Sequence, residues 1–197
     1  VGGGLLGLEA AEGLKDLGAE PTILDVAPWL LSVEVDQGGG YAVNAQIKAT
    51  GIEIETGVYI SGINKDADGN VISVSIADSP SEDAEIRTLP ADMVVFGAGI
   101  RANDELARDA DLALGERGGI LVNDACHTSD EHIWAIGEVA CVLGRTWGLV
   151  APANAMADAV AANLLNDNEE AQVEEFDIAT KLKFSGVQVA GFGDRRG

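Results

Sequence analysis

The chain opens with a glycine-rich stretch that runs straight into apolar residues at helical spacing. One face of the helix predicted over residues 5–17 carries four of these residues: Leu5, Leu8, Ala11 and Leu14. A short apolar run over 21–25 predicts a buried strand that ends in an acid. A second helix is predicted over 35–50, because Asp36 supplies an N-terminal cap and Gly51 a C-terminal stop. The chain thus begins as loop, helix, strand and helix.

The pattern changes to alternation between residues 52 and 89. Runs over 58–63 and 71–76 alternate apolar and polar residues, and the turn-forming stretch Asp-Ala-Asp-Gly-Asn lies between them at 66–70. Such a turn between two alternating runs predicts an antiparallel hairpin. The next run, 91–96, is apolar nearly throughout, which is typical of a strand buried on both faces of a parallel sheet.

Shorter elements are predicted in the second half of the chain. They are a helix that ends near Ala110, strands over 119–122 and 133–136, and an alanine-rich helix over 152–165. An acidic stretch over 166–175 is interpreted as a linker, and strands over 180–184 and 187–192 would begin a further unit. Together the elements predict an α/β fold, with a Rossmann-like domain in three layers that combines a parallel sheet with an antiparallel hairpin or meander.

The charge balance limits the partners that the chain could bind. The sequence has 33 acidic and 12 basic residues, a formal net charge of -21, and only five lysines. Nucleic acid and anionic membrane surfaces are therefore excluded as partners, because binding to them needs clustered Lys and Arg. No apolar run reaches the roughly 18 residues of a membrane span. No signal peptide is recognisable either, so we expect a cytoplasmic protein.

The two cysteines, Cys126 and Cys141, are too far apart for a Cys-x-x-Cys motif. Two buried free thiols in a reducing compartment are favoured over a disulfide or a metal site. The histidines, His127 and His132, form no ligand pattern with other residues, so no metal site is predicted.

Residues 2–7, Gly-Gly-Gly-Leu-Leu-Gly, fit the G-x-G-x-x-G pattern at the start of a helix, and Asp25 ends the next strand about 20 residues later. Gly2 would allow the tight turn, Gly4 the approach of a pyrophosphate, and Gly7 the close packing of helix and sheet. The free N–H groups at the helix N-terminus would bind the phosphates. The alternative is a glycine-rich turn without a ligand, but the order of loop, helix, strand and acid favours a dinucleotide.

Asp25 also predicts which dinucleotide is bound. Its carboxylate would accept hydrogen bonds from the ribose hydroxyls and would repel a 2′-phosphate. The following residues 26–28, Val-Ala-Pro, supply no arginine for such a phosphate. NADH is therefore favoured over NADPH.

A second motif, residues 128–138, ends an apolar run in Gly137 and Glu138 and so places a carboxylate at the edge of a sheet. Together with the glycine loop and the stretch Phe-Gly-Ala-Gly-Ile-Arg at 96–101, this motif resembles the FAD-dependent pyridine nucleotide-disulfide oxidoreductase family. More narrowly, the chain is similar to the reductase part of assimilatory NAD(P)H nitrite reductase large subunits in five further stretches, at 115–120, 148–152, 180–183, 186–187 and 192–194.

The resemblance implies three parts and a set of cofactor-binding residues. Residues 1–97 would be an NAD(P)-binding domain that lacks its first strand, 98–166 the C-terminal half of an FAD-binding domain, and 167–197 an acidic linker with the start of a truncated C-terminal domain. NAD would be bound by Gly2, Gly4, Leu5, Leu6, Gly7 and Asp25, its nicotinamide end would lie near Glu9 and Gly99, and FAD would be bound by Gly137, Glu138 and Pro152. No residue is implied as a general acid or base, because the flavin carries the chemistry.

On this resemblance the chain is expected to be an internal part of a longer flavoenzyme. Hydride would pass from NADH to FAD, and electrons would then reach an acceptor domain whose sirohaem reduces nitrite to ammonia in nitrite assimilation. The sirohaem and an iron–sulfur cluster would lie outside this chain. The chain alone would retain no FAD and bind NADH weakly at best, and a homodimer is left open.

Two other functions stay open at this point. Rubredoxin or ferredoxin reductases and NADH oxidases share the glycine loop and the Gly137–Glu138 motif, although residues 148–152 and 180–194 favour the nitrite reductase. In a different class, the chain would be a nucleotide-binding module without catalysis. An upstream glycine-loop motif in the same reading frame would support the flavoenzyme over the module.

The acidic, lysine-poor composition leads to a prediction about salt. High salt screens like charges to within a few ångströms and so removes the self-repulsion of the folded chain. If the composition is an adaptation to a high-salt cytoplasm, the thermal unfolding midpoint should rise between dilute buffer and molar KCl. A midpoint that stays constant or falls over this range would contradict the hypothesis.

Overall fold

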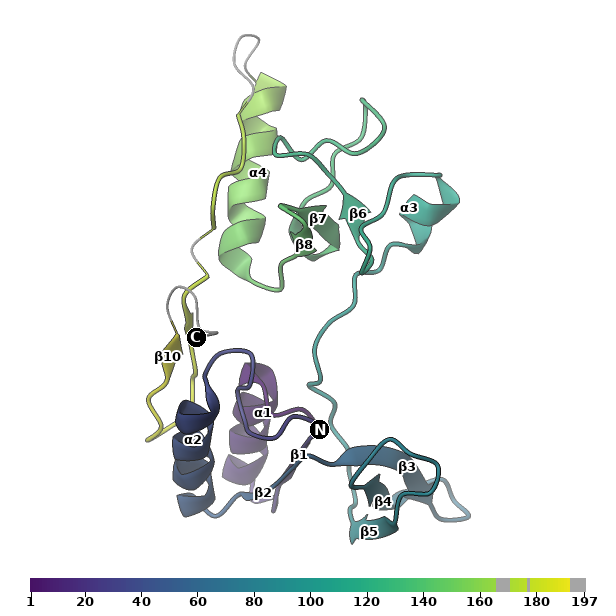
Figure 1. The fold of residues 1–197 in the computed structure, drawn as a ribbon, viewed down its shortest axis with the longest axis vertical. Helices are drawn as coiled ribbons and strands as arrows, with labels where there is room; N and C mark the ends of the chain where they lie inside the picture. Colours follow the sequence, from purple (N-terminus) through teal and green to yellow (C-terminus); the bar gives the residue numbers. More distant parts are fainter. Residues whose placement is uncertain (166–170, 177, 192–197) are drawn as a thin grey trace. The chain divides into compact units, whose positions relative to one another are not determined.

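A computed structural model describes residues 1–165, 171–176 and 178–191 (Figure 1). The chain forms two compact units, which are described separately below. The first contains residues 1–99 together with the described residues from Ala179 onward, and the second contains residues 100–178. Both contain helices and strands, so the predicted α/β class is confirmed. The predicted division into an NAD(P)-binding domain (1–97), half of an FAD-binding domain (98–166) and a linker with the start of a further domain (167–197) stays a prediction.

The first unit begins with the predicted alternation of helices and strands. Its elements are α1 (Leu5–Asp16), β1 (Thr22–Asp25), α2 (Gln37–Ala49) and β2 (Glu53–Thr56). The two strands pair in parallel, with Thr22 opposite Glu53 and Asp25 opposite Thr56. The predicted cap of the second helix is confirmed, because the carboxylate of Asp36 accepts a hydrogen bond from the N–H of Gly39 at 2.8 Å.

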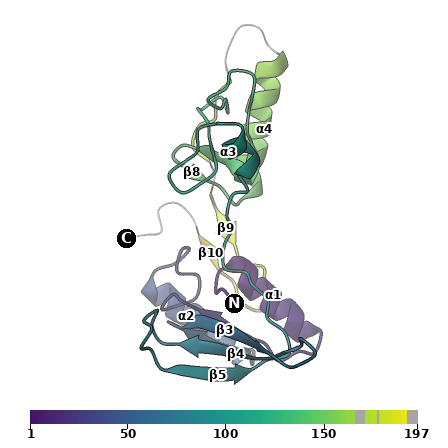
Figure 2. The same ribbon diagram turned by 90° about the vertical axis from the view of Figure 1, so that its right-hand side faces the viewer.

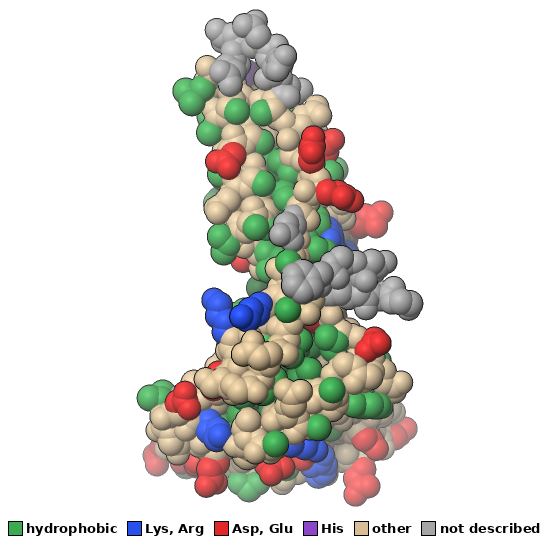
Figure 3. Space-filling model, turned by 90° about the vertical axis from the view of Figure 1, so that its left-hand side faces the viewer, with side chains coloured by type: hydrophobic (Ala, Val, Ile, Leu, Met, Phe, Trp, Pro, Cys, Tyr) green, Lys and Arg blue, Asp and Glu red, His purple; other side chains and the backbone are tan. Residues whose placement is uncertain are grey.

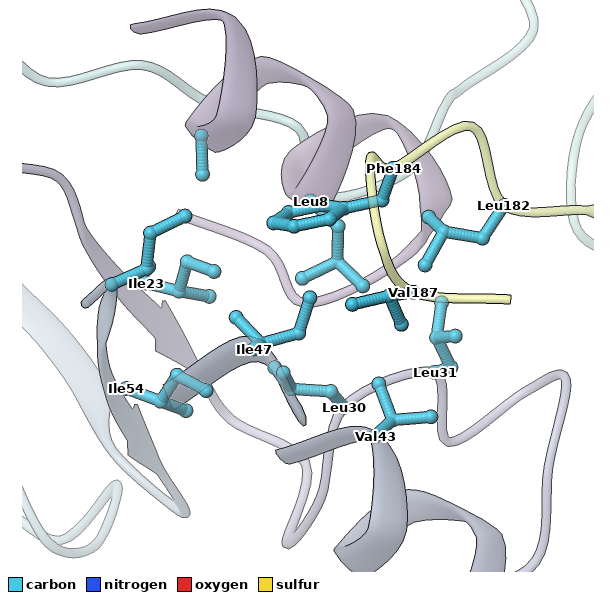
Figure 4. Packing of buried hydrophobic residues seen from close by; sticks show 12 residues of the cluster. Leu8, Ile23, Leu30, Leu31, Val43, Ile47, Ile54, Leu182, Phe184 and Val187 are labelled. Carbon is cyan, nitrogen blue, oxygen red and sulfur yellow. The ribbon is translucent and has the colours of Figure 1, made fainter. Parts of the chain in front are cut away.

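Successive residues of β1 point to opposite faces of the strand pair and so create two apolar layers. Ile23 packs into a cluster with residues of α1 and α2 (Figure 4). Leu24 packs into a second cluster with Val58, Val74 and Ile76, which belong to or precede the antiparallel strands. The short parallel sheet therefore lies between a helical layer and an antiparallel sheet.

The antiparallel sheet contains the predicted hairpin and one additional strand. Its strands, β3 (Tyr59–Lys65), β4 (Val71–Ala77) and β5 (Ile86–Pro90), lie side by side in the order β3-β4-β5 (Figures 1 and 2). An ion pair between Arg87 on β5 and Glu55 on β2 links this sheet to the parallel pair. The prediction for 58–63 and 71–76 is confirmed, and the alternation that continues to Leu89 corresponds to the third strand.

The buried strand predicted over 91–96 is wrong. No regular strand is assigned to this run, and Met93 and Phe96 are 67% and 60% exposed. Only Val1 and Gly2 lie between this run and β1, since Gly97 donates to the carbonyl of Val1 at 2.7 Å and Gly2 to that of Leu24 at 2.8 Å. A regular β-ladder needs several paired residues on each of its two strands, and the two residues Val1 and Gly2 are too few to form one.

The second unit contains only short strands around one long helix. Its elements are α3 (Glu105–Asp109), β6 (Ile120–Leu121), the 3₁₀ turn η1 (Gly137–Val139), β7 (Ala140–Val142), β8 (Arg145–Thr146) and α4 (Val150–Leu165). Its core includes Val142 and Met156, and the thiols of Cys126 and Cys141 are both free and buried, as predicted. Burial raises the pKa of both thiols and so favours their protonated form.

The strand predicted over 133–136 is also wrong. It forms a single bridge, between His127 and Trp134, rather than a ladder. The segment that contains His127 bends at the preceding residue, Cys126, whose φ of 64° lies in the left-handed region. The pairing therefore does not continue beyond this bridge.

The C-terminal residues form a hairpin within the first unit. Strands β9 (Thr180–Lys181) and β10 (Ala190–Gly191) pair antiparallel, and Leu182, Phe184 and Val187 enter the helical layer's apolar cluster. The structure groups these residues with the first unit, and the prediction that they begin a further domain stays a prediction. The predicted motif at 192–194 and the first half of the acidic stretch, 166–170, lie outside the described residues.

Acidic side chains are scattered over the surface rather than gathered in one patch on the face drawn in Figure 3. None of the helices in the described part of the chain is long and apolar enough to cross a membrane.

Asp104 is a buried carboxylate that organises the second unit. It is only 8% exposed, accepts a hydrogen bond from the N–H of Gly119 at 2.7 Å, and pairs with Arg108 at 3.1 Å. The Gly119 N–H, with help from Arg108, holds the pKa of Asp104 below its ordinary value. The carboxylate therefore ties α3 to the glycine-rich turn that precedes β6.

We expect Asp104→Asn to lower the thermal unfolding midpoint by several degrees at pH 7, because the charged acceptor is lost. A group with a depressed pKa stabilises the fold above its ordinary pKa, near ~4, and loses this effect as the pH falls through the lower folded-state value. The difference between wild type and variant should therefore shrink in acid. Asp109→Asn, at an exposed position on the same helix, is the control. Equal midpoints for the Asp104 variant and wild type at pH 7 would contradict this role.

Candidate functional site

Two glycines lie too close to backbone atoms to carry a side chain: Gly2 in the loop before α1 and Gly7 in the first turn of α1. Gly2 has a φ of 103°, and a Cβ placed on it would lie 2.5 Å from the carbonyl oxygen of Gly97. A Cβ on Gly7 would overlap the carbonyl oxygen of Gly2. The first turn of α1 can therefore lie against the loop only because both positions are glycine.

Gly4 differs from these two glycines because the space beside it is open. A Cβ on Gly4 would meet no other atom within 4 Å. Gly4 is also the N-cap of α1, where no side chain caps the helix and no acidic residue occupies its first turn. The N–H groups of Leu5, Leu6 and Gly7 thus lie at the positive end of a 12-residue helix, beside space that an anion could occupy.

Asp25 lies at the end of β1 and fastens the glycine loop to the sheet. One carboxylate oxygen accepts a hydrogen bond from the N–H of Gly3, and the other accepts from the N–H of Ala27 at 2.7 Å. A carboxylate offers about four acceptor positions, so about two remain for hydroxyl groups of a ligand. The acid is thus held in one orientation next to the open helix N-terminus.

A hollow of about 260 Å³ adjoins this carboxylate. Its walls are mainly apolar, and they include Leu24, Val26, Val58, Ile60 and Phe96. An apolar hollow with one carboxylate at its edge suits a flat heterocycle joined to a sugar, because the ring can enter the hollow while the sugar hydroxyls donate to the carboxylate. Phosphate-binding N–H groups, a hydroxyl acceptor and an apolar hollow thus occur together at the edge of one sheet, as a dinucleotide requires.

Two residues predicted near the nicotinamide end have different surroundings. Gly99 is exposed, with a φ of 89°. Glu9 accepts a hydrogen bond from the N–H of Lys183 at 3.0 Å, so its carboxylate contacts the C-terminal hairpin. The predicted cofactor roles of both residues stay predictions.

The second unit positions the residues predicted to bind FAD. Gly137 has a φ of 77° and begins η1, which carries the exposed carboxylate of Glu138. Pro152 is buried in the first turn of α4. These residues lie at a turn and at a helix N-terminus, where backbone N–H groups are available to a ligand. Their contacts with FAD stay a prediction.

Sequence reasoning did not identify two residues that hold the glycine loop and its helix. Leu31 donates its backbone N–H to the carbonyl of Gly3 at 2.8 Å. Glu12 accepts from the N–H of Ser185 at 2.5 Å. The spacing of three between Glu9 and Glu12 puts both carboxylates on one face of α1, which is a signal that the sequence contains. No comparable signal marks Leu31. Across the described ranges, no three His, Cys, Asp or Glu side chains come together as a metal site would need.

Comparison with known proteins identifies relatives along the whole chain. A family model described as pyridine nucleotide-disulphide oxidoreductase matches residues 1–162. The chain is 42% identical over its whole length to the NAD(P)H nitrite reductase large subunit of Klebsiella oxytoca and covers 19% of that protein. It is 40% identical over its whole length to the NADH nitrite reductase large subunit of Escherichia coli (strain K12) and covers 22% of it. The chain thus spans about a fifth of the length of these two relatives.

A solved structure has a similar fold. It is an FAD-dependent pyridine nucleotide-disulphide oxidoreductase from Desulfovibrio vulgaris, with a TM-score of 0.83 and 27% sequence identity. The match covers 98% of this chain and 47% of that one. The α/β arrangement described above is therefore similar to part of that oxidoreductase.

Proposed function

Because the chain belongs to the pyridine nucleotide-disulphide oxidoreductase family, we propose that it forms the NADH-binding part and a portion of the FAD-binding part of a flavoprotein reductase. In this proposal the first unit is a Rossmann-like, three-layer domain that binds NADH. The second unit contributes the C-terminal half of the FAD site. The protein acts in the cytoplasm.

The observation that carries the proposal is the open N-terminus of α1. The first-turn N–H groups lie beside Gly4, where the space is free of other atoms, and the carboxylate of Asp25 is fixed next to them. The pyrophosphate would be bound by these N–H groups, and the adenosine ribose hydroxyls by Asp25. The adjoining apolar hollow would accept the adenine.

Asp25 supports NADH rather than NADPH as the nucleotide. Its carboxylate accepts hydrogen bonds from two backbone N–H groups, which hold it in one orientation where a 2′-phosphate would have to bind. No arginine occurs among residues 26–28 to offset that repulsion. Binding of a 2′-phosphate there would bring two negative groups together at short range.

In the second unit, the residues proposed to hold FAD are Gly137, Glu138 and Pro152. When bound, FAD would supply the hydride-accepting chemistry at its ring. The exposed Glu138 would accept hydrogen bonds from the hydroxyls of the flavin's sugar-like chain, and the first turn of α4 would offer N–H groups. The contribution of this chain is thus binding and orientation, with no general acid or base.

The finer proposal is an electron-input role in nitrite assimilation. It is supported by identities of 42% and 40% to nitrite reductase large subunits over the whole chain. A sirohaem and an iron–sulfur cluster would belong to an electron-acceptor domain outside the matched region.

A substitution at Gly4 tests nucleotide binding. The φ and ψ of Gly4, -80° and -179°, suit any residue, so Gly4→Ala should leave the unfolding midpoint unchanged. Its new Cβ would fill the space that the pyrophosphate approaches, so the affinity for NADH in a fluorescence titration should fall about tenfold or more, a change of about 1.4 kcal/mol. Gly13→Ala, further along α1 where a Cβ also meets no atom within 4 Å, should leave the affinity unchanged. Equal affinity of the Gly4 variant and wild type would contradict the proposal.

A chimera tests the finer proposal. In the E. coli relative, the region that matches this chain would be replaced by residues 1–197. We expect the chimera to bind FAD and to reduce nitrite with NADH, because every proposed cofactor-binding residue is retained. The Gly4→Ala chimera should keep FAD and lose most of the NADH-dependent rate. A folded, FAD-containing chimera without NADH-dependent activity would overturn the electron-input role.

A further inference from the structure

Leu31 has a backbone conformation that its side chain disfavours. Its φ is 54°, in the left-handed region, although leucine has a Cβ and the side chain is 99% removed from solvent, with 1% exposed. Such a conformation persists in a folded protein only where surrounding contacts enforce it. The backbone N–H of Leu31 donates to the carbonyl of Gly3 in the glycine loop at 2.8 Å. The strained residue is therefore attached directly to the proposed phosphate-binding loop.

The side chain of Leu31 is covered by the C-terminal hairpin. Figure 4 shows Val187 between Leu31 and Leu8, with Leu182 and Phe184 on the same side of the cluster. Val187 and Leu182 are each 2% exposed, so these contacts are dry. Val187 of the hairpin thus packs between Leu31 and Leu8 of α1.

Two carboxylates of α1 hold the same hairpin through its backbone. Glu9 accepts the N–H of Lys183 at 3.0 Å, and Glu12 accepts the N–H of Ser185 at 2.5 Å. A hydrogen bond from a backbone N–H to a charged carboxylate is stronger than one between neutral groups. These contacts join parts of the chain that are more than 170 residues apart.

We propose that the C-terminal hairpin and Leu31 together position the glycine loop for the dinucleotide, with Leu31 as a positioning residue. This inference rests on the proposed binding of NADH at that loop. The hairpin keeps Leu31 in its left-handed conformation, and the N–H of Leu31 then fixes the carbonyl of Gly3. Since Asp25 fixes the N–H of the same glycine, both polar groups of Gly3 are held, and the N–H groups that follow it point in one direction.

Val187→Ala tests this positioning role against a purely structural one. Its control is Ile54→Ala, in the same apolar cluster but at the end away from Leu31 and Val187 (Figure 4). The control removes more buried carbon, so it should lower the unfolding midpoint at least as much. At a temperature where both variants are folded, only Val187→Ala should weaken NADH binding, by about fivefold, and speed hydrogen exchange at the Leu31 amide.

Variants of Glu12 supply a second readout. Glu12→Ala should give the same loss of NADH affinity as Val187→Ala, whereas Glu12→Gln should restore most of it, because an amide oxygen can still accept from Ser185. Wild-type affinity in both Val187→Ala and Glu12→Ala, or an equal loss in Ile54→Ala, would overturn the proposal. If neither the wild-type chain nor the chimera with the E. coli relative binds NADH, the proposed function fails. In that case, unchanged Leu31 exchange in Val187→Ala would independently overturn the support by the hairpin.

Discussion

The first unit depends on the two hydrogen bonds that hold the N–H and the carbonyl of Gly3. Its N–H is bonded to Asp25 at the end of β1, and its carbonyl to the N–H of Leu31. The glycine loop is thereby tied to the sheet and to the loop before α2 at once. Because α1 starts in this loop, the same two bonds determine where the helix N-terminus points. The same hydrogen bonds therefore stabilise the first unit and orient the proposed nucleotide site.

The layers on either side of β1 explain how a short sheet can support this arrangement. Ile23 and Leu24 are neighbours in sequence, yet they belong to different apolar clusters because successive side chains of a strand point to opposite faces. The helical cluster is completed by residues of the C-terminal hairpin, which contributes three buried side chains. The core next to the glycine loop is therefore built from both ends of the chain.

The family assignment and the local geometry support each other while addressing different questions. The match over residues 1–162 identifies an oxidoreductase family, and the identities of about 40% point to nitrite reductase large subunits. The open space at Gly4, the orientation of Asp25 and the adjoining hollow explain how this chain could bind a dinucleotide. The proposed role in nitrite assimilation rests on the similarity to these relatives alone.

The sequence by itself determined α1, α2, the first hairpin and the order of glycine loop, strand and acid. These features depend on periodicity, caps and turn residues within a few positions of one another. Only the tertiary structure decided that 91–96 is not a buried strand, that Leu31 adopts a left-handed conformation, and that Glu9 and Glu12 bind the C-terminal hairpin. Local patterns cannot predict these features, because each depends on packing between segments far apart in the chain.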